Sequence, residues 1–288
     1  MSVQERRAQL RAILGGERCA IASSLFDPMS ARIADALGFE VGLIGGSVAS
    51  LAVLGAPDLA LITLTELAEQ ARRVCRAGRL SVVVDADHGY GNALNVMRTV
   101  EELESAGVAG ATIEDTALPL SFAGETAAAP PLIPQEEGVG KMKAALKARS
   151  AGMAVLGRTH AVMFAGVDDA IQRLQAYERA GVDALFVPYL KNRGQLDAIA
   201  QAVRLPLVLA GCDDSLADTD YLASRRVRIW MSSHQPFAAA VGAMYEAQRA
   251  MREALVPEPL PGSASAALMA SLTRSADYDS MKRDYGLQ

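Results

Sequence analysis

Acidic residues follow two consecutive apolar segments of the sequence. Asp85 and Asp87 come directly after the segment that ends at Val84, and Glu114 follows the next one. Alternate residues of a β-strand point to the same side, so Asp85 and Asp87 can face one side together while Ala86 packs on the other. Three carboxylates this close repel one another unless a cation lies among them. The pattern predicts a divalent metal site with oxygen ligands, which favours Mg²⁺ or Mn²⁺ over zinc.

Two further charged residues lie after apolar segments. Asp58 is a candidate for a fourth, water-mediated carboxylate, although alone it is an ordinary turn residue; the acids as a group can also be read as helix caps and a surface acid. Arg158 directly follows the fifth apolar segment, where a buried guanidinium needs an anionic partner. A substrate carboxylate would bind it in bidentate fashion. A structural ion pair with one of the acids is the alternative.

Small and weakly basic residues complete the candidate site. Gly45, Gly46 and Ser47 follow the second apolar segment, where backbone amides can approach an anion closely, although Gly-Gly-Ser also forms ordinary turns. His234 can bind substrate or donate a proton, or be a hydrogen-bonded loop histidine. We interpret His88 as part of a turn and His160 as a supporting residue. No combination of Ser, His and Asp forms a triad, so the nucleophile is not expected to be a side chain.

Apolar segments and segments with helical periodicity alternate along the chain. Short apolar segments rich in Val, Ile and Leu are typical of strands buried on both faces of a parallel sheet, and eight occur: Cys19–Ala22, Val41–Ile44, Leu80–Val84, Gly110–Ile113, Met153–Leu156, Ala184–Val187, Leu205–Leu209 and Val227–Met231. Most precede a segment with helical periodicity: Leu94–Ala106, Gly138–Ala148, Ala170–Ala180, Leu196–Ala202 and Ala238–Ala250. The alternation predicts a (β/α)8 barrel, whose catalytic residues lie at the carboxyl ends of its strands. An open doubly wound sheet is the alternative, but no Gly-x-Gly-x-x-Gly follows the first strand.

The composition limits the possible partners and location. The chain has 288 residues and a net charge of −5, which argues against a nucleic-acid surface. Its three cysteines show no disulfide or zinc spacing and favour a reducing compartment. No signal peptide is recognisable, and the apolar segments are too short to cross a membrane. We therefore expect a soluble cytoplasmic enzyme with no nucleic-acid or membrane partner.

The chain divides into a catalytic barrel, 1–255, and a C-terminal helical extension, 256–288. Within the barrel, Ala117–Gln135 is a long loop of the kind that forms lids or binding loops. A proline-containing segment, Val256–Ser265, leads to two short predicted helices, Ala266–Leu272 and Tyr278–Tyr285. Because the barrel is already complete, these helices are expected to close its bottom or dock on a neighbouring subunit.

Several of these segments together resemble the isocitrate lyase/phosphoenolpyruvate mutase superfamily. The resemblance covers nearly the whole chain and is carried by Phe26–Ala31, Val84–Asn92, Ile113–Asp115, Gly138–Lys141 and Arg158-Thr159. It implies a barrel, Mg²⁺ at Asp85 with Asp58, Asp87 and Glu114 in support, an enolate-type intermediate, and a homotetramer whose subunits exchange a C-terminal helix.

Within the superfamily, Gly45–Ser50 and the pair Ser233-His234 look most like the oxaloacetate decarboxylase subgroup. That resemblance implies a carboxy-lyase that converts oxaloacetate, a small α-keto acid, to pyruvate and CO₂ through a metal-stabilised enolate. Ser47, Arg158 and His234 are then the substrate contacts, with Arg158 and His234 in the catalytic roles. No organic cofactor is expected, because a β-keto acid accepts the electron pair itself.

The chain also departs from its relatives at several positions, among them the loop Gly211–Asp214. The strand-four loop, 117–137, lacks the cysteine of the carbon–carbon lyases and the Asn-Asp-Lys-Thr-type stretch of the phosphonate-processing members. His160 stands where Asp, Asn or Glu is usual, and Pro188-Tyr189 where an acid is frequent. The alternatives are a lyase or hydrolase of another small α-keto or 2-hydroxy acid (methylisocitrate-like or phosphonopyruvate-like) at the same metal site, and a non-catalytic metabolite-binding barrel.

Overall fold

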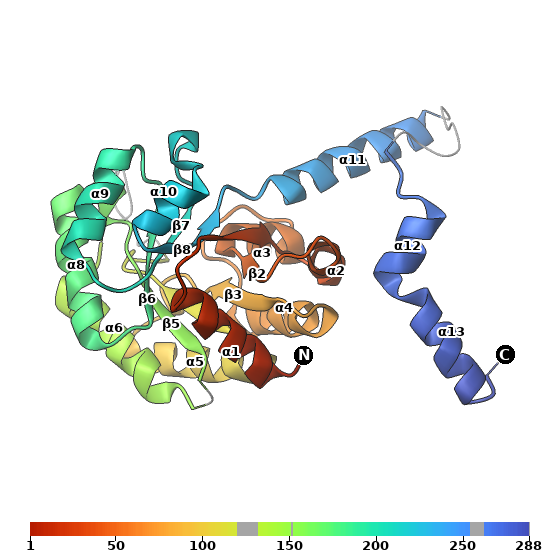
Figure 1. Ribbon diagram of the computed structural model, residues 1–288, viewed down its shortest axis with the longest axis horizontal. Coiled ribbons are helices and arrows are strands. Elements are labelled where there is room, and N and C mark those ends of the chain that lie inside the picture. Colours follow the sequence, from red (N-terminus) through yellow and green to blue (C-terminus); the bar gives the residue numbers. More distant parts are fainter. Residues whose placement is uncertain (120–131, 151, 254–261, 288) are drawn as a thin grey trace.

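Eight parallel strands form a closed barrel in which neighbours in sequence are neighbours in space (Figure 1). The computed structural model describes residues 1–119, 132–150, 152–253 and 262–287. The strands are β1 (Ala20–Ser24), β2 (Val41–Ile44), β3 (Ser81–Asp85), β4 (Gly110–Ile113), β5 (Ala154–Arg158), β6 (Ala184–Pro188), β7 (Leu207–Ala210) and β8 (Val227–Met231). Each predicted strand is confirmed to within a few residues. Pairing of β1 with β8 closes the barrel and excludes the open doubly wound sheet.

Alternation along the strands separates two apolar layers. In β3, Val83 belongs to the cluster inside the barrel, and Val82 and Val84 belong to the cluster between strands and helices. Because side chains alternate along a strand, Asp85 shares the inward direction of Val83. By the same rule Arg158 follows Leu156 of the inner cluster. The strand periodicity therefore brings both charged residues to the barrel mouth.

Helices surround the barrel and also close its bottom. The described helices of the barrel are α1 (Val3–Leu14), α2 (Pro28–Ala36), α3 (Gly46–Leu54), α4 (Leu64–Ala77), α5 (Ala93–Ala106), α6 (Gln135–Ala148), α7 (Ala161–Phe164), α8 (Val167–Ala180), α9 (Arg193–Ala202) and α10 (Thr219–Ser224), with one 3₁₀ turn, η1 (Asp214–Leu216). Leu10, Ile13 and Leu14 of α1 belong to the inner apolar cluster. The bottom of the barrel is therefore closed by α1 and not by the C-terminal helices, which was one of the two roles expected for them.

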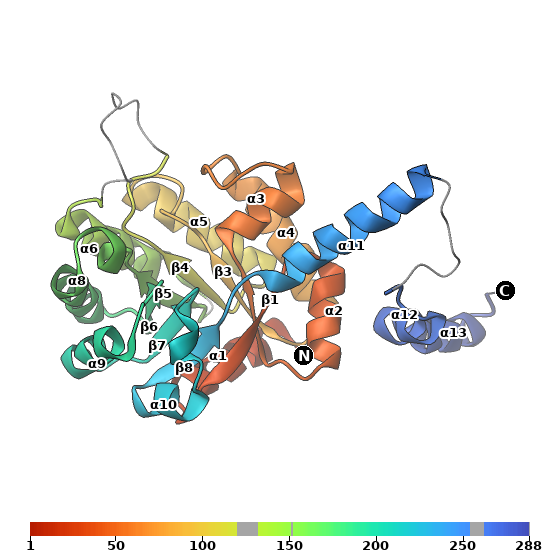
Figure 2. The same ribbon diagram turned by 90° about the horizontal axis from the view of Figure 1, so that it is seen from above.

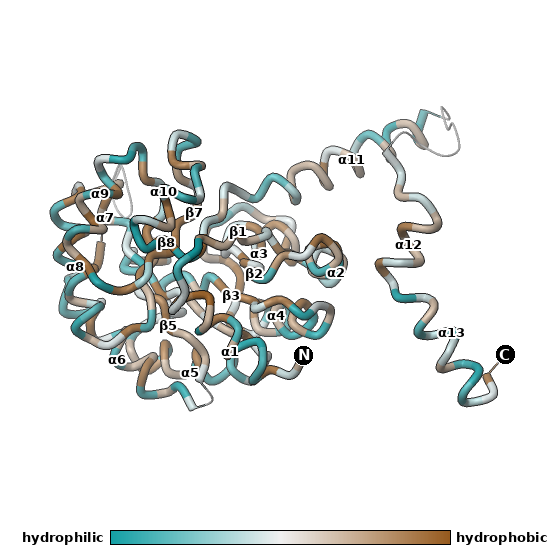
Figure 3. Tube along the Cα trace, viewed as in Figure 1, coloured by the Kyte–Doolittle hydropathy of each residue, from teal (hydrophilic) through white to brown (hydrophobic). Residues whose placement is uncertain are grey.

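The C-terminal helices form an arm that extends from the barrel (Figures 1 and 2). It consists of α11 (Gln235–Arg252), α12 (Ala266–Thr273) and α13 (Ser275–Asp284), and α12 lies next to α2. The predicted helix at 238–250 is confirmed, but it does not cover the barrel as a (β/α)8 helix normally does, since none of its residues is buried. Figure 3 shows hydrophobic stretches along α11 and α12 as well as along the strands.

Two sequence expectations fall mostly on residues outside the described ranges. Most of the predicted lid, Ala117–Gln135, and much of the segment Val256–Ser265 lie there. At the base of the lid, Thr116 pairs with Leu132 in an isolated antiparallel bridge. Among the described residues, no helix has the length and apolar character needed to span a membrane.

Candidate active site

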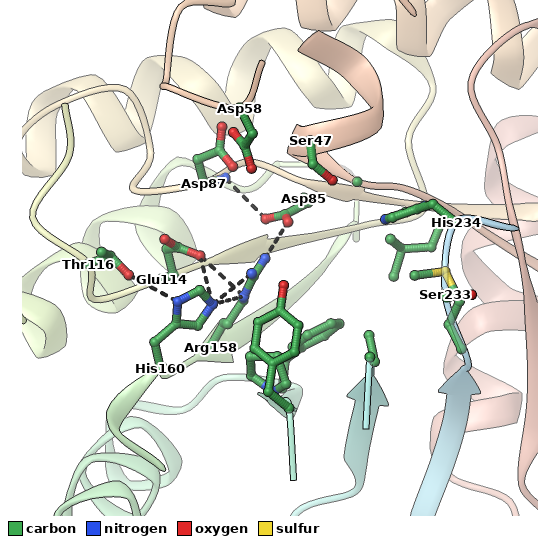
Figure 4. Close-up of a pocket in the computed structure, with 18 of the residues that line it drawn as sticks. Ser47, Asp58, Asp85, Asp87, Glu114, Thr116, Arg158, His160, Ser233 and His234 are labelled. Carbon is green, nitrogen blue, oxygen red and sulfur yellow. Dashed lines mark hydrogen bonds and ion pairs between the residues drawn. The ribbon is translucent and has the colours of Figure 1, made fainter. Parts of the chain in front are cut away.

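A cavity of about 320 Å³ opens at the carboxyl ends of the strands. Its polar wall carries most of the residues singled out in the sequence, and its apolar wall comes from β2, β6, β7 and β8 (Figure 4). The lining includes Gly45, Ser47, Asp58, Asp85, Asp87, Glu114, Arg158 and His234; Gly46 lies immediately behind it, with its Cα against Asp87. The structure therefore brings the predicted residues together around one space.

Asp85 is held by hydrogen bonds to both of its carboxylate oxygens. Oδ1 accepts from Thr112 Oγ1 at 3.0 Å and from the backbone N–H of Asp87 at 3.2 Å. Oδ2 accepts from Nη1 of Arg158. Burial alone would raise the pKa of Asp85, but the Arg158 guanidinium outweighs that effect and lowers the pKa. Asp85 is therefore ionised and fixed in direction at neutral pH.

Asp87 has a different environment, in which negative charge is not balanced. Burial and the neighbouring carboxylates of Asp85, Glu114 and Asp58 raise the pKa of Asp87 well above its usual value. Burial, followed by the charges of Asp85 and Glu114, also raises the pKa of Asp58. Asp87 adopts a left-handed backbone conformation (φ 46°), which is uncommon for a residue with a side chain and typical of functional sites. A cation placed near these acids would favour their ionised forms.

Arg158 lies between the acids of β3 and β4. Besides its contact with Asp85, its Nε lies 3.2 Å from Oε2 of Glu114, and its guanidinium carbon lies 5.2 Å from the centre of the Phe186 ring. Burial disfavours the charged guanidinium, but Asp85 and Glu114 outweigh it and raise the pKa of Arg158. Burial raises the pKa of Glu114, an effect that Arg158 opposes. In this structure Arg158 makes the ion pairs that the sequence left open as an alternative.

His160 lines the cavity beside Arg158. Its Nε2 atom lies 3.0 Å from Nε and 2.7 Å from Nη2 of Arg158, and its Nδ1 lies 3.4 Å from Oγ1 of Thr116. Burial and the positive charge of Arg158 lower the pKa of His160 to about 3. His160 therefore contacts the arginine directly and lines the cavity itself, whereas the sequence analysis expected it only to support other site residues.

Gly45 and Gly46 are required by close approaches of two side chains. A Cβ atom at Gly45 would lie 2.5 Å from Nε2 of His234, and one at Gly46 would lie 2.2 Å from Oδ1 of Asp87. Gly45 is also the N-cap of α3, whose first turn includes Ser47. The first backbone N–H groups of a helix have no partner within the helix. The two glycines therefore leave space for the side chains of His234 and Asp87, and they place the first backbone N–H groups of α3 at the edge of the cavity.

Sequence reasoning missed a buried network that supports the mouth. Asp115, fully buried, accepts hydrogen bonds from the backbone N–H of His160, from Tyr177 Oη and from Arg173. Lys141, in the Gly-Val-Gly-Lys motif, donates from Nζ to the backbone oxygen of His88 at 2.9 Å. The signal for both was present as polar residues within otherwise apolar patterns, but their partners are distant in sequence.

The donor set suits a hard divalent cation. Among the described residues that line the cavity, four carboxylates (Asp58, Asp85, Asp87 and Glu114) face one guanidinium, and oxygen donors without thiolate favour Mg²⁺-like ions. No three His, Cys, Asp or Glu side chains of the described ranges already converge as a ligand set. The excess of buried negative charge and the free space fit a cation.

An acidic cavity at the carboxyl ends of the strands, where barrel enzymes carry their active sites, makes this protein a (β/α)8 barrel enzyme. The chain belongs to the phosphoenolpyruvate phosphomutase family, whose model matches residues 10–252. This confirms the superfamily membership expected from the sequence motifs.

Similar proteins support this membership over nearly the whole chain. A Rhodopseudomonas palustris (strain BisA53) protein named oxaloacetate decarboxylase is 58% identical over 97% of this chain and 96% of its own. A Bradyrhizobium sp. (strain ORS 278) protein of the same name is 53% identical over 99% and 98%. A solved phosphonopyruvate hydrolase in complex with oxalate and Mg²⁺ is 27% identical, with a TM-score of 0.84 over 99% of both chains.

Proposed function

We propose that this protein is a Mg²⁺-dependent oxaloacetate decarboxylase, with Mn²⁺ as an alternative metal. The observation that carries the proposal is the cavity in which four carboxylates face one guanidinium, in a chain that is 53–58% identical to proteins named oxaloacetate decarboxylase. Asp85, Asp87 and Glu114, with Asp58 in support, would hold the cation. When bound, a divalent cation would act there as a Lewis acid that stabilises negative charge on substrate oxygens.

The chain's own residues bind the substrate and fix its orientation. Arg158, with Ser47 and the first-turn amides of α3, binds the carboxyl end of oxaloacetate, and His234 contacts the other end or the C2 oxygen. The C3–C4 bond breaks, CO₂ leaves, and its electron pair passes into the enolate of pyruvate. One proton taken up at C3 then gives pyruvate. The apolar wall formed by Leu43, Phe186 and Met231 limits access of water to the enolate.

The test is CO₂ release from oxaloacetate by purified protein, compared with Mg²⁺ alone because the metal itself decarboxylates this substrate slowly. We expect release well above that background, its loss in EDTA, its return with Mg²⁺, and its abolition by Asp85→Ala. An unchanged rate in Asp85→Ala would contradict the site. No excess release, together with turnover of phosphonopyruvate or methylisocitrate, would support the alternative lyase or hydrolase. Binding of keto acids without any turnover would support a non-catalytic barrel.

We further propose that the barrel, 1–255, and the helical extension, 256–288, assemble into a cytoplasmic homotetramer. Helix α11 has no buried residue and exposes Val241, Met244 and Tyr245 on one face. In the described part of α12 and α13 only Leu272 is buried. Contiguous exposed apolar faces are typical of subunit interfaces, which favours exchange of the arm between subunits. The free cysteines favour the reducing cytoplasm.

A further inference from the structure

The contact between His160 and Arg158 determines which atom of the histidine carries its proton. A guanidinium group has donors and no acceptor. Nε and Nη2 of Arg158 lie 3.0 Å and 2.7 Å from Nε2 of His160, closer than Oε2 of Glu114 at 3.4 Å, so that nitrogen is the acceptor of both arginine N–H groups. An imidazolium has no free electron pair to accept a hydrogen bond. His160 is therefore neutral, with its proton on Nδ1, which faces Oγ1 of Thr116 (Figure 4).

The position of the His160 ring is itself fixed from several sides. Its backbone N–H donates to Oδ1 of Asp115, which is fully buried. The rings of Phe164 and Tyr189 lie near it, with centroids at 6.2 Å and 6.0 Å from that of His160. A ring held in this way presents Nε2 in one direction only, so the guanidinium that donates to it is also restricted to one orientation.

We propose that His160 is a positioning residue for Arg158: it orients the guanidinium by accepting two hydrogen bonds and adds no negative charge to it. A carboxylate at position 160 would also accept from Arg158, but it would compete with an anionic substrate for the same positive charge. The surrounding acids Asp85 and Glu114 already contact Arg158. A neutral acceptor therefore orients Arg158 without competing with a substrate carboxylate for its positive charge. This inference rests on the proposed function only in assigning the carboxylate of the substrate to Arg158.

Three variants separate charge from hydrogen bonding at this position. His160→Gln keeps a neutral acceptor near the place of Nε2, whereas His160→Asp replaces it with a carboxylate. Gln201→Glu is the matched control, because it adds the same charge at an exposed position of α9 outside the cavity. The readout is the Kd of oxalate, a small dicarboxylate, measured by calorimetry in the presence of Mg²⁺. Circular dichroism and thermal unfolding verify that each variant folds.

We expect His160→Asp to weaken oxalate binding by at least about tenfold. We expect His160→Gln to change it by less than about threefold, and Gln201→Glu to leave it unchanged. Oxalate binding by folded His160→Asp as tight as that of the unaltered chain would overturn the proposal, as would an equal loss in His160→Gln. Absence of oxalate binding by the unaltered chain would also overturn it. Normal oxalate binding without release of CO₂ from oxaloacetate would refute the proposed function and leave this inference standing.

A second readout reports directly on the proton. The chain contains three histidines, so the ¹⁵N resonances of His160 can be assigned by their loss in His160→Gln. We expect a protonated Nδ1 and an unprotonated Nε2 in the metal-free protein. A proton on Nε2, or on both nitrogens, would overturn the proposal, because Nε2 then has no electron pair for Arg158.

Discussion

Oγ of Ser24 lies 2.7 Å from Nδ1 of His234. Ser24 ends β1 and is 3% exposed, while His234 follows β8, so this contact joins the first and last strands of the barrel at its mouth. With Nδ1 engaged, Nε2 is the nitrogen left toward the cavity, beside Gly45. The orientation of the proposed substrate-binding histidine therefore depends on a serine that carries no recognisable motif.

We predict that Ser24→Ala lowers kcat/KM for oxaloacetate about fivefold, which corresponds to the loss of roughly 1 kcal/mol for one hydrogen bond. The reason is that His234 becomes free to rotate. Ser23→Ala is the matched control, because Ser23 precedes it on the same strand and points to the opposite side. Steady-state kinetics of both variants provide the measurement. Equal effects of the two substitutions would show that the contact with His234 has no functional role.

Asp87→Asn is predicted to have opposite effects on the stability of the metal-free protein and on metal binding. The pKa of Asp87 is raised by burial and by Asp85 and Glu114. As the pH rises, the unfolded chain therefore loses this proton before the native protein does, and the native state loses stability. Asparagine has no proton to lose, so in EDTA at pH 8 the variant should unfold about 2–4 °C higher. The difference should disappear near pH 4.

Added Mg²⁺ should reverse this order in thermal unfolding. The unaltered chain should gain stability with increasing Mg²⁺ concentration because the ion binds only the native state, whereas Asp87→Asn should gain little. Glu101→Gln is the control, since Glu101 is an exposed residue of α5 outside the cavity. If Asp87→Asn were less stable than the unaltered chain in EDTA at pH 8, the raised pKa of Asp87 in the metal-free protein would be contradicted.

The strands and the position of the site could be predicted because both follow from local pattern. Continuous apolar segments predict buried parallel strands, and inward alternation places Asp85 and Arg158 at the same mouth. The sequence could not show whether Arg158 pairs with Asp85 and Glu114 or with a substrate carboxylate, because either partner requires the same arginine at the same position. Contacts such as Ser24 with His234 join residues 210 positions apart, and no local pattern encodes such a pairing.

The sequence also could not predict that α11 extends away from the barrel. The reason is different: an apolar helix face has the same sequence pattern whether the barrel or another subunit covers it.

The three cysteines are predicted to react slowly with thiol reagents at pH 8. Burial raises the pKa of Cys75 to about 12 and the pKa values of Cys19 and Cys212 to about 11. Because the thiolate is the reactive form, reaction of the native protein should accelerate about tenfold per pH unit between pH 7 and 9 without reaching a plateau. Absorbance with a chromogenic disulfide reagent measures this, with guanidinium-unfolded protein as the control in which three thiols react rapidly. A native thiol that reacts at a pH-independent rate over this range would contradict the raised pKa values.

Tyr245→Glu on α11 is predicted to break the assembly while leaving each barrel folded. Tyr245 is 66% exposed and shares one helix face with Val241 and Met244. In a proposed interface built from these side chains, a buried carboxylate without a partner would be strongly unfavourable. Light scattering after size-exclusion chromatography should give a lower mass than for the unaltered chain, at similar circular dichroism. Ala243→Glu, on the opposite face of the same helix, should keep the full mass; dissociation by Ala243→Glu alone would place the interface on the other face of α11, and an unaltered mass in both variants would exclude this helix from the assembly.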